Sequence, residues 1–142
     1  MHYLDTSAII AVLINEPARD RLRATLHTVE RDGFAASFWT DTEVASALSL
    51  KVRTDDLSLE ERSAVRAEWR RWRSGMHILA VAEHHFASAA DFAEHAALSL
   101  RGGDALHLAI ARAADCRLIT LDKNMARAAP EVGVSVTHIL PT

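Results

Sequence analysis

Short apolar segments alternate with longer amphipathic segments along almost the whole chain, and this order restricts the fold more than any other feature. The short segments have the composition of strands, and five are predicted, at 2–4, 34–38, 77–81, 117–121 and 134–139. Helical spacing of apolar residues predicts helices at 8–14, 18–29, 40–48, 58–74, 83–98, 104–114 and 123–129. Strands connected through helices form right-handed crossovers, so we expect an α/β fold whose five-stranded, mostly parallel sheet is covered on both faces.

The composition is typical of one water-soluble domain, which we expect to span residues 1–142. The 49% of hydrophobic and 25% of charged residues exclude disordered and collagen-like chains. The longest uncharged run, 132–142, is far shorter than the ~18 apolar residues of a membrane-spanning helix. The N-terminus lacks a cationic segment before an apolar one, which favours a cytoplasmic protein. A single cysteine, Cys116, excludes an internal disulfide and a cysteine-rich zinc site.

Acidic residues follow three of the predicted strands. Asp5 comes directly after the first strand, Glu43 one helical turn after the second, and Asp122 directly after the fourth. Sites in open parallel sheets lie beyond the carboxyl ends of the strands, so we expect these three side chains at one edge. Helix capping is the alternative for each of them taken singly, and Thr40-x-x-Glu43 matches a capping box. Asp104 begins a helix, and periodicity alone does not place it beside the others.

Converging carboxylates require a positive group between them. Two carboxylates ~5 Å apart repel each other by ~3 kcal/mol at an effective dielectric constant of 20. A hard divalent cation with oxygen ligands, Mg²⁺ or Mn²⁺, is a better occupant than zinc, which favours His and Cys. Such an ion stabilises phosphoryl oxygens and lowers the pKa of bound water, so the pattern favours phosphodiester hydrolysis.

Four segments of the sequence resemble the PIN-domain family, in particular the VapC-type toxins of bacterial toxin–antitoxin pairs. They are Tyr3-Leu4-Asp5-Thr6-Ser7-Ala8, TDTEVASAL around Glu43, RGGDALHLAIA around Asp104 and LITLDKNMARAA around Asp122. The resemblance covers nearly the whole chain, and DALHLA is its most specific motif. It implies a three-layer α/β/α sandwich and a metal-dependent endoribonuclease.

The resemblance also implies the site residues. Asp5, Glu43, Asp104 and Asp122 match the four acidic positions of the family and are the expected catalytic residues and Mg²⁺ or Mn²⁺ ligands. Thr6 is expected to hold the Asp5 carboxylate or a water of the site, with ordinary helix capping as the alternative. Thr120 and Asn124 are expected to support the ligands from behind.

Three neighbouring residues receive separate predictions. Trp39 departs from the family, in which smaller polar residues are more typical on the approach to Glu43, and this departure concerns the shape of the substrate site. Asp41 lies two residues before Glu43 and so faces elsewhere on a helix, which favours a capping role. His107 lies one turn after Asp104, and packing or a water bridge is favoured over metal ligation.

The implied reaction is hydrolysis of an RNA phosphodiester. Water attacks in line, and the products carry 5′-phosphate and 3′-hydroxyl ends. A carboxylate such as Glu43 is expected to help remove the proton from the attacking water. The resemblance further implies a homodimer and a VapB-like antitoxin that directs an arginine at the acidic site, where a guanidinium would replace the charge of the metal.

A basic helical face is the predicted contact for RNA. The chain carries 16 Lys and Arg against 19 Asp and Glu, so its net charge of −3 does not by itself attract RNA. Arginines recur at helical spacing, however, and form a positive strip of Arg62, Arg66, Arg70 and Arg73. The alternative is that their stems cover Trp69 and Trp72 while their charges pair with Glu61 and Glu68.

Two other function classes remain open at this level. An aspartyl-phosphate phosphatase also places an Asp after the first parallel strand beside Mg²⁺. It requires a second Asp two residues later, where this chain has Ser7, and a receiver domain requires an Asp after the third strand, where it has Ala82 and Glu83. The other alternative is a catalytically silent binding module of the same fold, and the four intact acidic positions disfavour it.

Overall fold

A computed structural model describes residues 1–140, so the last two residues of the predicted domain, 141 and 142, lie outside the described part. Along these residues the chain forms a parallel sheet of five strands: β1 (His2–Leu4), β2 (Phe34–Ser37), β3 (His77–Leu79), β4 (Arg117–Thr120) and β5 (Val136–His138). The α-helices are α1 (Thr6–Leu13), α2 (Arg19–Val29), α3 (Phe38–Arg53), α4 (Leu59–Arg73), α5 (Glu83–Glu94), α6 (Gly102–Ala113) and α7 (Lys123–Ala128). The predicted fold class is confirmed.

The strand order β3-β2-β1-β4-β5 places β1 at the centre of the sheet. Tyr3 pairs with Ala35 on one side and with Leu118 on the other, and all strand pairs are parallel. The chain builds outward from β1 to β3 and then returns to the other side of β1 for β4 and β5. The order therefore reverses between β1 and β4, and ligands of open α/β sheets bind at such a point.

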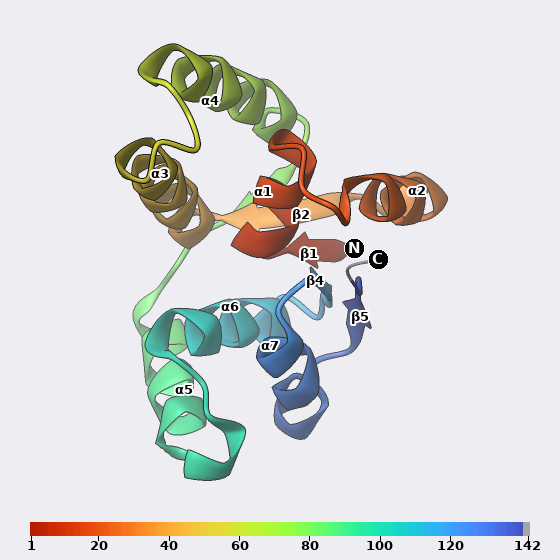
Figure 1. Cartoon of the computed structure of the whole chain (residues 1–142). Coiled ribbons are helices and arrows are strands. Elements are labelled where there is room, and N and C mark those ends of the chain that lie inside the picture. Colours follow the sequence, from red (N-terminus) through yellow and green to blue (C-terminus); the bar gives the residue numbers. More distant parts are fainter. Residues whose placement is uncertain (141–142) are drawn as a thin grey trace.

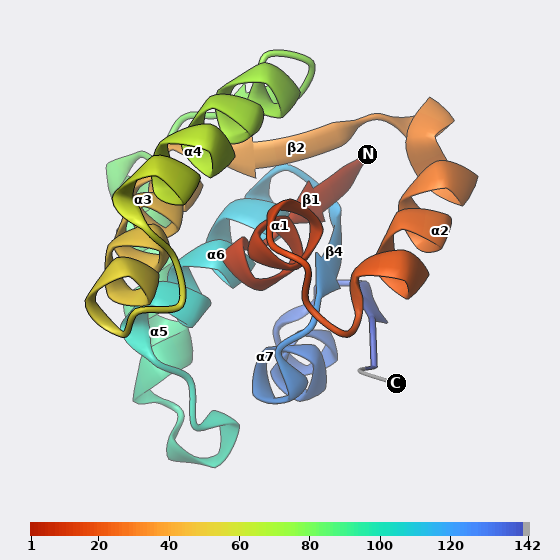
Figure 2. The ribbon, with the colours of Figure 1, turned by 45° about the horizontal axis from the view of Figure 1, so that its top comes forward.

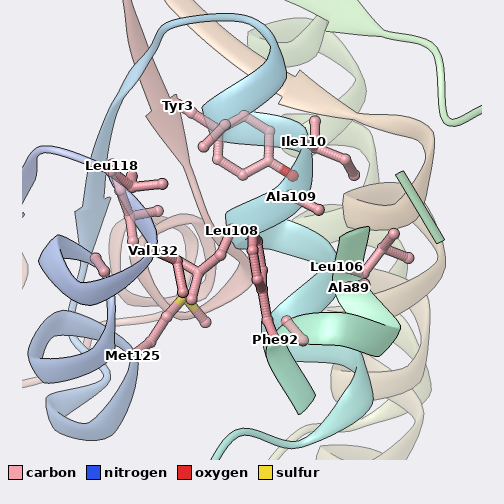
Figure 3. Close-up of a cluster of buried hydrophobic side chains, with 14 of the residues drawn as sticks. Tyr3, Ala89, Phe92, Leu106, Leu108, Ala109, Ile110, Leu118, Met125 and Val132 are labelled. Carbon is pink, nitrogen blue, oxygen red and sulfur yellow. The ribbon is translucent and has the colours of Figure 1, made fainter. Parts of the chain in front are cut away.

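Two hydrophobic cores lie on the two faces of the sheet, and successive strand residues alternate between them. Tyr3 and Leu118 point into the core formed with α5, α6 and α7, whereas Leu4 and Ile119 point into the core formed with α1 to α4. Figure 1 shows these helices on opposite sides of the strands, and Figure 3 shows Tyr3 and Leu118 among the side chains of the first core. The expected three-layer sandwich follows from this alternation.

Several helix boundaries differ from the predicted ones, each for a local reason. The third helix begins at Phe38, earlier than predicted, because Ser37 caps it and forms a capping box with Thr40. The predicted helix over 83–98 ends at Glu94 and is followed by a 3₁₀ turn, Ala96–Leu98, and by Ser99 in a left-handed conformation (φ 51°). A 3₁₀ turn at Glu30–Asp32 precedes β2, and the positive φ of Gly33 (79°) allows the chain to turn into the strand.

A third 3₁₀ turn, Pro130–Val132, connects α7 to β5. No helix within residues 1–140 is long and apolar enough to cross a membrane.

Figure 2 shows α1 lying over the central strands, with its first turn directly following β1. Because β1 and β4 run parallel and pair with each other, the residues that follow them lie at the same edge of the sheet, where the functional site was expected.

Candidate active site

Asp5 is the innermost acidic residue of this edge. It caps α1, where its Oδ1 accepts a hydrogen bond from the backbone N–H of Ala8 at 3.0 Å, and it is 2% exposed. The hydroxyl of Ser7 donates to both carboxylate oxygens at 2.7 and 2.9 Å, and Thr120 of β4 donates to Oδ2 at 2.7 Å. The capping predicted as the alternative for Asp5 is therefore present, and the same carboxylate also accepts hydrogen bonds from Ser7 and from Thr120 of β4.

The surroundings of Asp5 perturb its ionisation. Burial raises the pKa of Asp5 above its ordinary range, because desolvation disfavours the charged carboxylate. His107 and the hydrogen bonds from Thr120, Ala8 and Ser7 act in the opposite direction, because they stabilise the carboxylate. Asp5 is thus held by hydrogen bonds from three residues, and these bonds only partly offset the effect of its burial.

Glu43, Asp104 and Asp122 line one cavity of about 540 Å³, together with Ser99, Arg101, Gly103 and Asn124, whereas the buried Asp5 is not part of its lining. Glu43 comes from α3, Asp104 from the first turn of α6, and Asp122 caps α7 by accepting from the N–H of Met125 at 2.7 Å. The carboxylates thus come from three elements that are far apart in the sequence. Arg101 was missed by the sequence analysis, although it lies three residues before Asp104 in the RGGD segment.

The ionisation of Asp104 shows that the four acidic groups act on one another. Burial and the charge of Asp122 raise the pKa of Asp104 to about 6, with smaller contributions in the same direction from Glu43 and Asp5. His107 acts in the opposite direction. Asp104 therefore lies within electrostatic reach of the other three carboxylates, including the ones from β1 and β4. Periodicity could not have placed it there.

Glu43 is held by a histidine rather than by a capping box. Its Oε1 lies 2.7 Å from Nε2 of His107, and the hydroxyl of Thr6 donates to the same oxygen at 3.4 Å. The box predicted for Thr40 and Glu43 is wrong, because Ser37 and Thr40 form it instead. His107 is 1% exposed and packed, as favoured from the sequence, but Glu43 and the Tyr3 hydroxyl are its direct partners.

The expected supporting residues have three different environments. Thr120 contacts Asp5 directly, and its hydroxyl also accepts from the N–H of Asp122 at 2.9 Å. Thr6 contacts Glu43, so the expectation that it holds Asp5 is wrong, and Ser7 does so instead. Asn124 lines the cavity, but its amide donates to the carbonyls of residues 98 and 99 and not to a carboxylate.

Ser7 is the supporting residue that the sequence analysis missed. Its position two residues after Asp5 is the only local signal, because the first turn of α1 brings its hydroxyl back to the carboxylate. The same hydroxyl accepts from the N–H of Leu121, which ties the end of β4 to α1.

The arginines Arg62, Arg66, Arg70 and Arg73 gather as predicted, but they line a separate cavity of about 380 Å³ between α3 and α4. Arg73 forms a bidentate pair with Asp41, with the closest contact at 2.7 Å, and Trp69 Nε1 donates to the same carboxylate. Asp41 is therefore not a cap. The alternative, in which the arginines pair with Glu61 and Glu68, is also wrong, because neither glutamate forms an ion pair within the described residues. Glu61 instead completes the capping box of α4.

Trp39 separates the acidic cavity from an apolar one. Its indole Nε1 donates to the carbonyl of Gly103 at 3.2 Å, and a Cβ at position 103 would lie 3.2 Å from the Trp39 ring. On the far side of Gly103 lies a cavity of about 310 Å³ lined by Trp39, Phe86, Leu106 and several alanines. Trp39 thus lines the apolar cavity and meets the acidic cavity only through Gly103, which lines both.

The donor set fits a hard divalent cation. Carboxylate side chains line the cavity, and a cation bound there would offset both the burial of Asp104 and the charge of Asp122, which together raise the pKa of Asp104 to about 6. Within residues 1–140, however, no three His, Cys, Asp or Glu side chains are already arranged to hold a metal ion. Binding therefore requires the carboxylates to turn toward a common point, and Glu43 and Asp122 are both partly engaged elsewhere.

Comparison with known proteins identifies the fold and its relatives. The family model described as PIN domain matches residues 2–130. FitAcB from Neisseria gonorrhoeae has a TM-score of 0.74 at 20% identity, and the match covers 97% of each chain. VapBC2 from Rickettsia felis, bound to a DNA fragment from its promoter, has a TM-score of 0.73 at 15% identity and covers 97% of this chain and 98% of the other.

A third structure is described by its activity. VapC20 from Mycobacterium tuberculosis, a toxin that cleaves the sarcin–ricin loop, has a TM-score of 0.67 at 18% identity, covering 90% of this chain and 95% of the other. No curated protein matches the sequence. At these identities the structural matches establish a common fold, and the family model is the finding that covers the acidic positions at 5, 43, 104 and 122.

Proposed function

Because the chain belongs to the PIN-domain family, we propose that it is a metal-dependent endoribonuclease that acts as the toxin of a toxin–antitoxin pair in the cytoplasm. The observation that carries this proposal is the cavity lined by Glu43, Asp104 and Asp122 beyond the carboxyl ends of the strands, next to Thr120, which hydrogen-bonds both the buried Asp5 carboxylate and the N–H of Asp122. One structural neighbour is described as a toxin that cleaves the sarcin–ricin loop, which supports a nuclease function for this chain.

Asp5, Glu43, Asp104 and Asp122 would hold one or two Mg²⁺ or Mn²⁺ ions. Bound there, such an ion would stabilise phosphoryl oxygens and lower the pKa of a water molecule. Asp5 contributes a carboxylate whose orientation is fixed by Ser7, Thr120 and the N–H of Ala8. Asp104 contributes one whose charge changes around pH 6 in the metal-free protein. The protein would thus supply one carboxylate ligand with a fixed orientation and one whose charge depends on pH.

The remaining chemistry falls to residues of the acidic cavity. Oε1 of Glu43 is held by His107, so Oε2 is the atom that would accept the proton of the attacking water. Arg101 is exposed at the rim of the cavity and would contact an RNA phosphate. Attack by water rather than by a ribose hydroxyl leaves 5′-phosphate and 3′-hydroxyl ends.

The proposed protein partners are a VapB-like antitoxin and a second copy of the chain. FitAcB and VapBC2 are neighbours of this fold, and another is described as a toxin–antitoxin complex from Klebsiella pneumoniae. An antitoxin arginine placed in the acidic cavity would satisfy several carboxylate oxygens at once, because a guanidinium presents its donors in a planar fork. It would compete with the metal for the same negative charge.

The arginine strip is proposed as a secondary RNA contact. Asp41, Val44 and Leu48 of α3 line its cavity, whereas Glu43 lies on roughly the opposite side of the same helix. An RNA bound at both places would therefore pass around α3. Reversing the charges of Arg66 and Arg70 together should lower the dependence of RNA binding on salt by about two released counterions, and an unchanged slope would remove the strip from the proposal.

The phosphatase alternative is disfavoured by Ser7. This residue occupies the position that requires a second Asp, and its hydroxyl is engaged by Asp5 and by the N–H of Leu121. The silent binding module is disfavoured by the clustering of all four acidic residues, which a purely structural fold does not need.

Labelled RNA incubated with and without Mg²⁺, and with EDTA, tests the proposal. We expect cleavage only with the metal, no cleavage by Asp5→Asn or Asp104→Asn, and 5′-phosphate ends on the fragments. A phosphatase substrate tested in parallel should stay intact. Metal-dependent cleavage of RNA by both Asn variants at the wild-type rate would refute the assignment. Thermal unfolding adds a separate readout, since Mg²⁺ at 100 times its Kd should stabilise the wild type by about 2.7 kcal/mol.

A further inference from the structure

A buried chain of hydrogen bonds runs from the central strand to Glu43. The hydroxyl of Tyr3 lies 2.7 Å from Nδ1 of His107, and Nε2 of His107 lies 2.7 Å from Oε1 of Glu43. Tyr3 is wholly buried and His107 is 1% exposed, so the path lies inside the protein. The chain thus connects β1, α6 and α3, and it ends at a carboxylate that lines the acidic cavity.

The donors and acceptors of this chain point in one direction. The ionised Glu43 carboxylate can only accept, so Nε2 of His107 carries the hydrogen. In the neutral imidazole Nδ1 then accepts, and the Tyr3 hydroxyl donates to it. The Ser37 hydroxyl, 2.9 Å from the Tyr3 oxygen, can donate in turn. A protonated imidazole would donate through both nitrogens, with the Tyr3 oxygen then accepting, so Nε2 of His107 donates to Glu43 in either state.

The two carboxylate oxygens of Glu43 have different surroundings. Oε1 receives His107 and, more distantly, Thr6. Oε2 has no hydrogen-bond partner among residues 1–140 and lies toward Gly103, 3.7 Å from where a Cβ would stand. A glutamate has three rotatable side-chain bonds, and a charge-assisted hydrogen bond to a fixed, buried ring removes much of that freedom.

We propose that Tyr3 and His107 are positioning residues, which hold Glu43 so that its second oxygen faces the acidic cavity. The inference rests on the proposed nuclease function, but it concerns how the protein presents a ligand and not which substrate it cuts. Neither residue lines the cavity, and Glu43 is the only residue lining the cavity to which His107 is hydrogen-bonded within residues 1–140. Residues that orient a metal ligand from behind typically change metal affinity or activity by about 10- to 100-fold when they are removed.

Three substitutions test the hydrogen-bonded path from Tyr3 through His107 to Glu43. Tyr3→Phe removes only the hydroxyl, His107→Leu removes both nitrogens, and His107→Gln keeps a donor N–H near the position of Nε2. His27 is exposed on α2, so His27→Leu is a matched control for the loss of an imidazole. Mn²⁺ affinity, measured by electron paramagnetic resonance without RNA, is the first readout. The second is kcat and KM for RNA cleavage in Mg²⁺, with thermal unfolding to confirm that each variant is folded.

We expect Tyr3→Phe to weaken Mn²⁺ binding about 10-fold and His107→Leu about 100-fold, with kcat lowered to a similar extent and KM for RNA unchanged. His107→Gln should recover most of the loss, and His27→Leu should match the wild type. If His107→Leu does not fold, Tyr3→Phe still decides, because it removes a single oxygen.

Wild-type Mn²⁺ affinity and kcat in folded Tyr3→Phe would overturn the inference, as would a His107→Gln variant no better than His107→Leu. These outcomes differ from a failure of the proposed function. If the wild type cleaves no RNA, the nuclease proposal fails, whereas the Mn²⁺ affinities of the same variants still decide whether Tyr3 and His107 position Glu43.

Discussion

Thr120 at the end of β4 donates a hydrogen bond of 2.7 Å to Oδ2 of Asp5, which directly follows β1, although the two residues are 115 positions apart. The bond spans the point at which the strand order reverses. Thr120 is wholly buried and Asp5 nearly so, so neither group has water as a substitute partner. The contact therefore links the stability of the sheet to the orientation of a candidate metal ligand.

We first expect Thr120→Val to destabilise the fold by about 1–3 kcal/mol, the cost of leaving a buried polar group without its partner. The pKa of Asp5 should rise further, because a hydrogen bond that stabilises its charged form is lost. Urea unfolding measures the first effect. Thr120→Ser retains the hydroxyl and is the control, and equal losses in the two variants would assign the effect to packing.

The second prediction concerns pH. The pKa of Asp104 rises from 3.8 to about 6 on folding, so between these values the folded state binds more protons than the unfolded state. Stability from this group therefore falls as pH increases from about 4 to 6, and is constant above. Asp104→Asn should remove this slope and raise the free energy of unfolding at pH 7, measured by urea unfolding in EDTA.

Asp91→Asn is the control for that measurement, because Asp91 is exposed on α5 and forms no ion pair in the described part of the chain. It should retain the wild-type slope. A slope that persists unchanged in Asp104→Asn would contradict the assignment. The same ionisation predicts that Mn²⁺ affinity increases with pH up to about 6, since a ligand carboxylate must be deprotonated.

The third prediction concerns the close approach of Gly103 and Trp39. A Cβ at position 103 would lie 3.2 Å from the Trp39 ring, so the strain of Gly103→Ala, about 1–3 kcal/mol, should exceed the gain of about 0.5–1 kcal/mol from alanine in a helix. In a Trp39→Leu background the strain is absent, and the same change should become stabilising. The double-mutant cycle measures this reversal, and equal effects in both backgrounds would contradict it.

The fourth prediction concerns the bidentate pair of Arg73 and Asp41. Asp41→Asn should cost about 1–2 kcal/mol, because it weakens charge-assisted hydrogen bonds from Arg73 and Trp69 in a half-buried setting. Arg73→Lys should cost a similar amount, since an ammonium cannot form the planar fork. Thermal and urea unfolding of both variants and of the double variant measure the coupling. Additive losses would show that the two side chains do not stabilise one another.

The local sequence was sufficient for the elements and for part of the site. Short apolar segments predicted all five strands, because the strands contribute side chains to the cores on the two faces of the sheet, although the edge strands β3 and β5 are only partly buried. Asp5 and Asp122 were located by their position directly after strands, since parallel strands end at one edge of the sheet. Asp104 begins a helix instead, and only the family resemblance placed it with the others.

The partners of the site residues were decided by the tertiary structure alone. Glu43 and Asp41 lie two positions apart on α3, yet one bonds His107 and the other Arg73, 64 and 32 residues away. Helical periodicity shows only that these side chains face different ways. Which donor meets each carboxylate depends on how α6 and α4 pack against the sheet.

What the sequence by itself determined is therefore the order of elements and the edge at which acids collect, because hydrophobic spacing and strand ends are local properties. Only the folded chain decided that Ser7 rather than Thr6 holds Asp5, and that a buried histidine holds Glu43. The physical reason is that a hydrogen bond depends on distances and angles at the scale of tenths of an ångström. Those are fixed by packing between segments that are far apart in the chain.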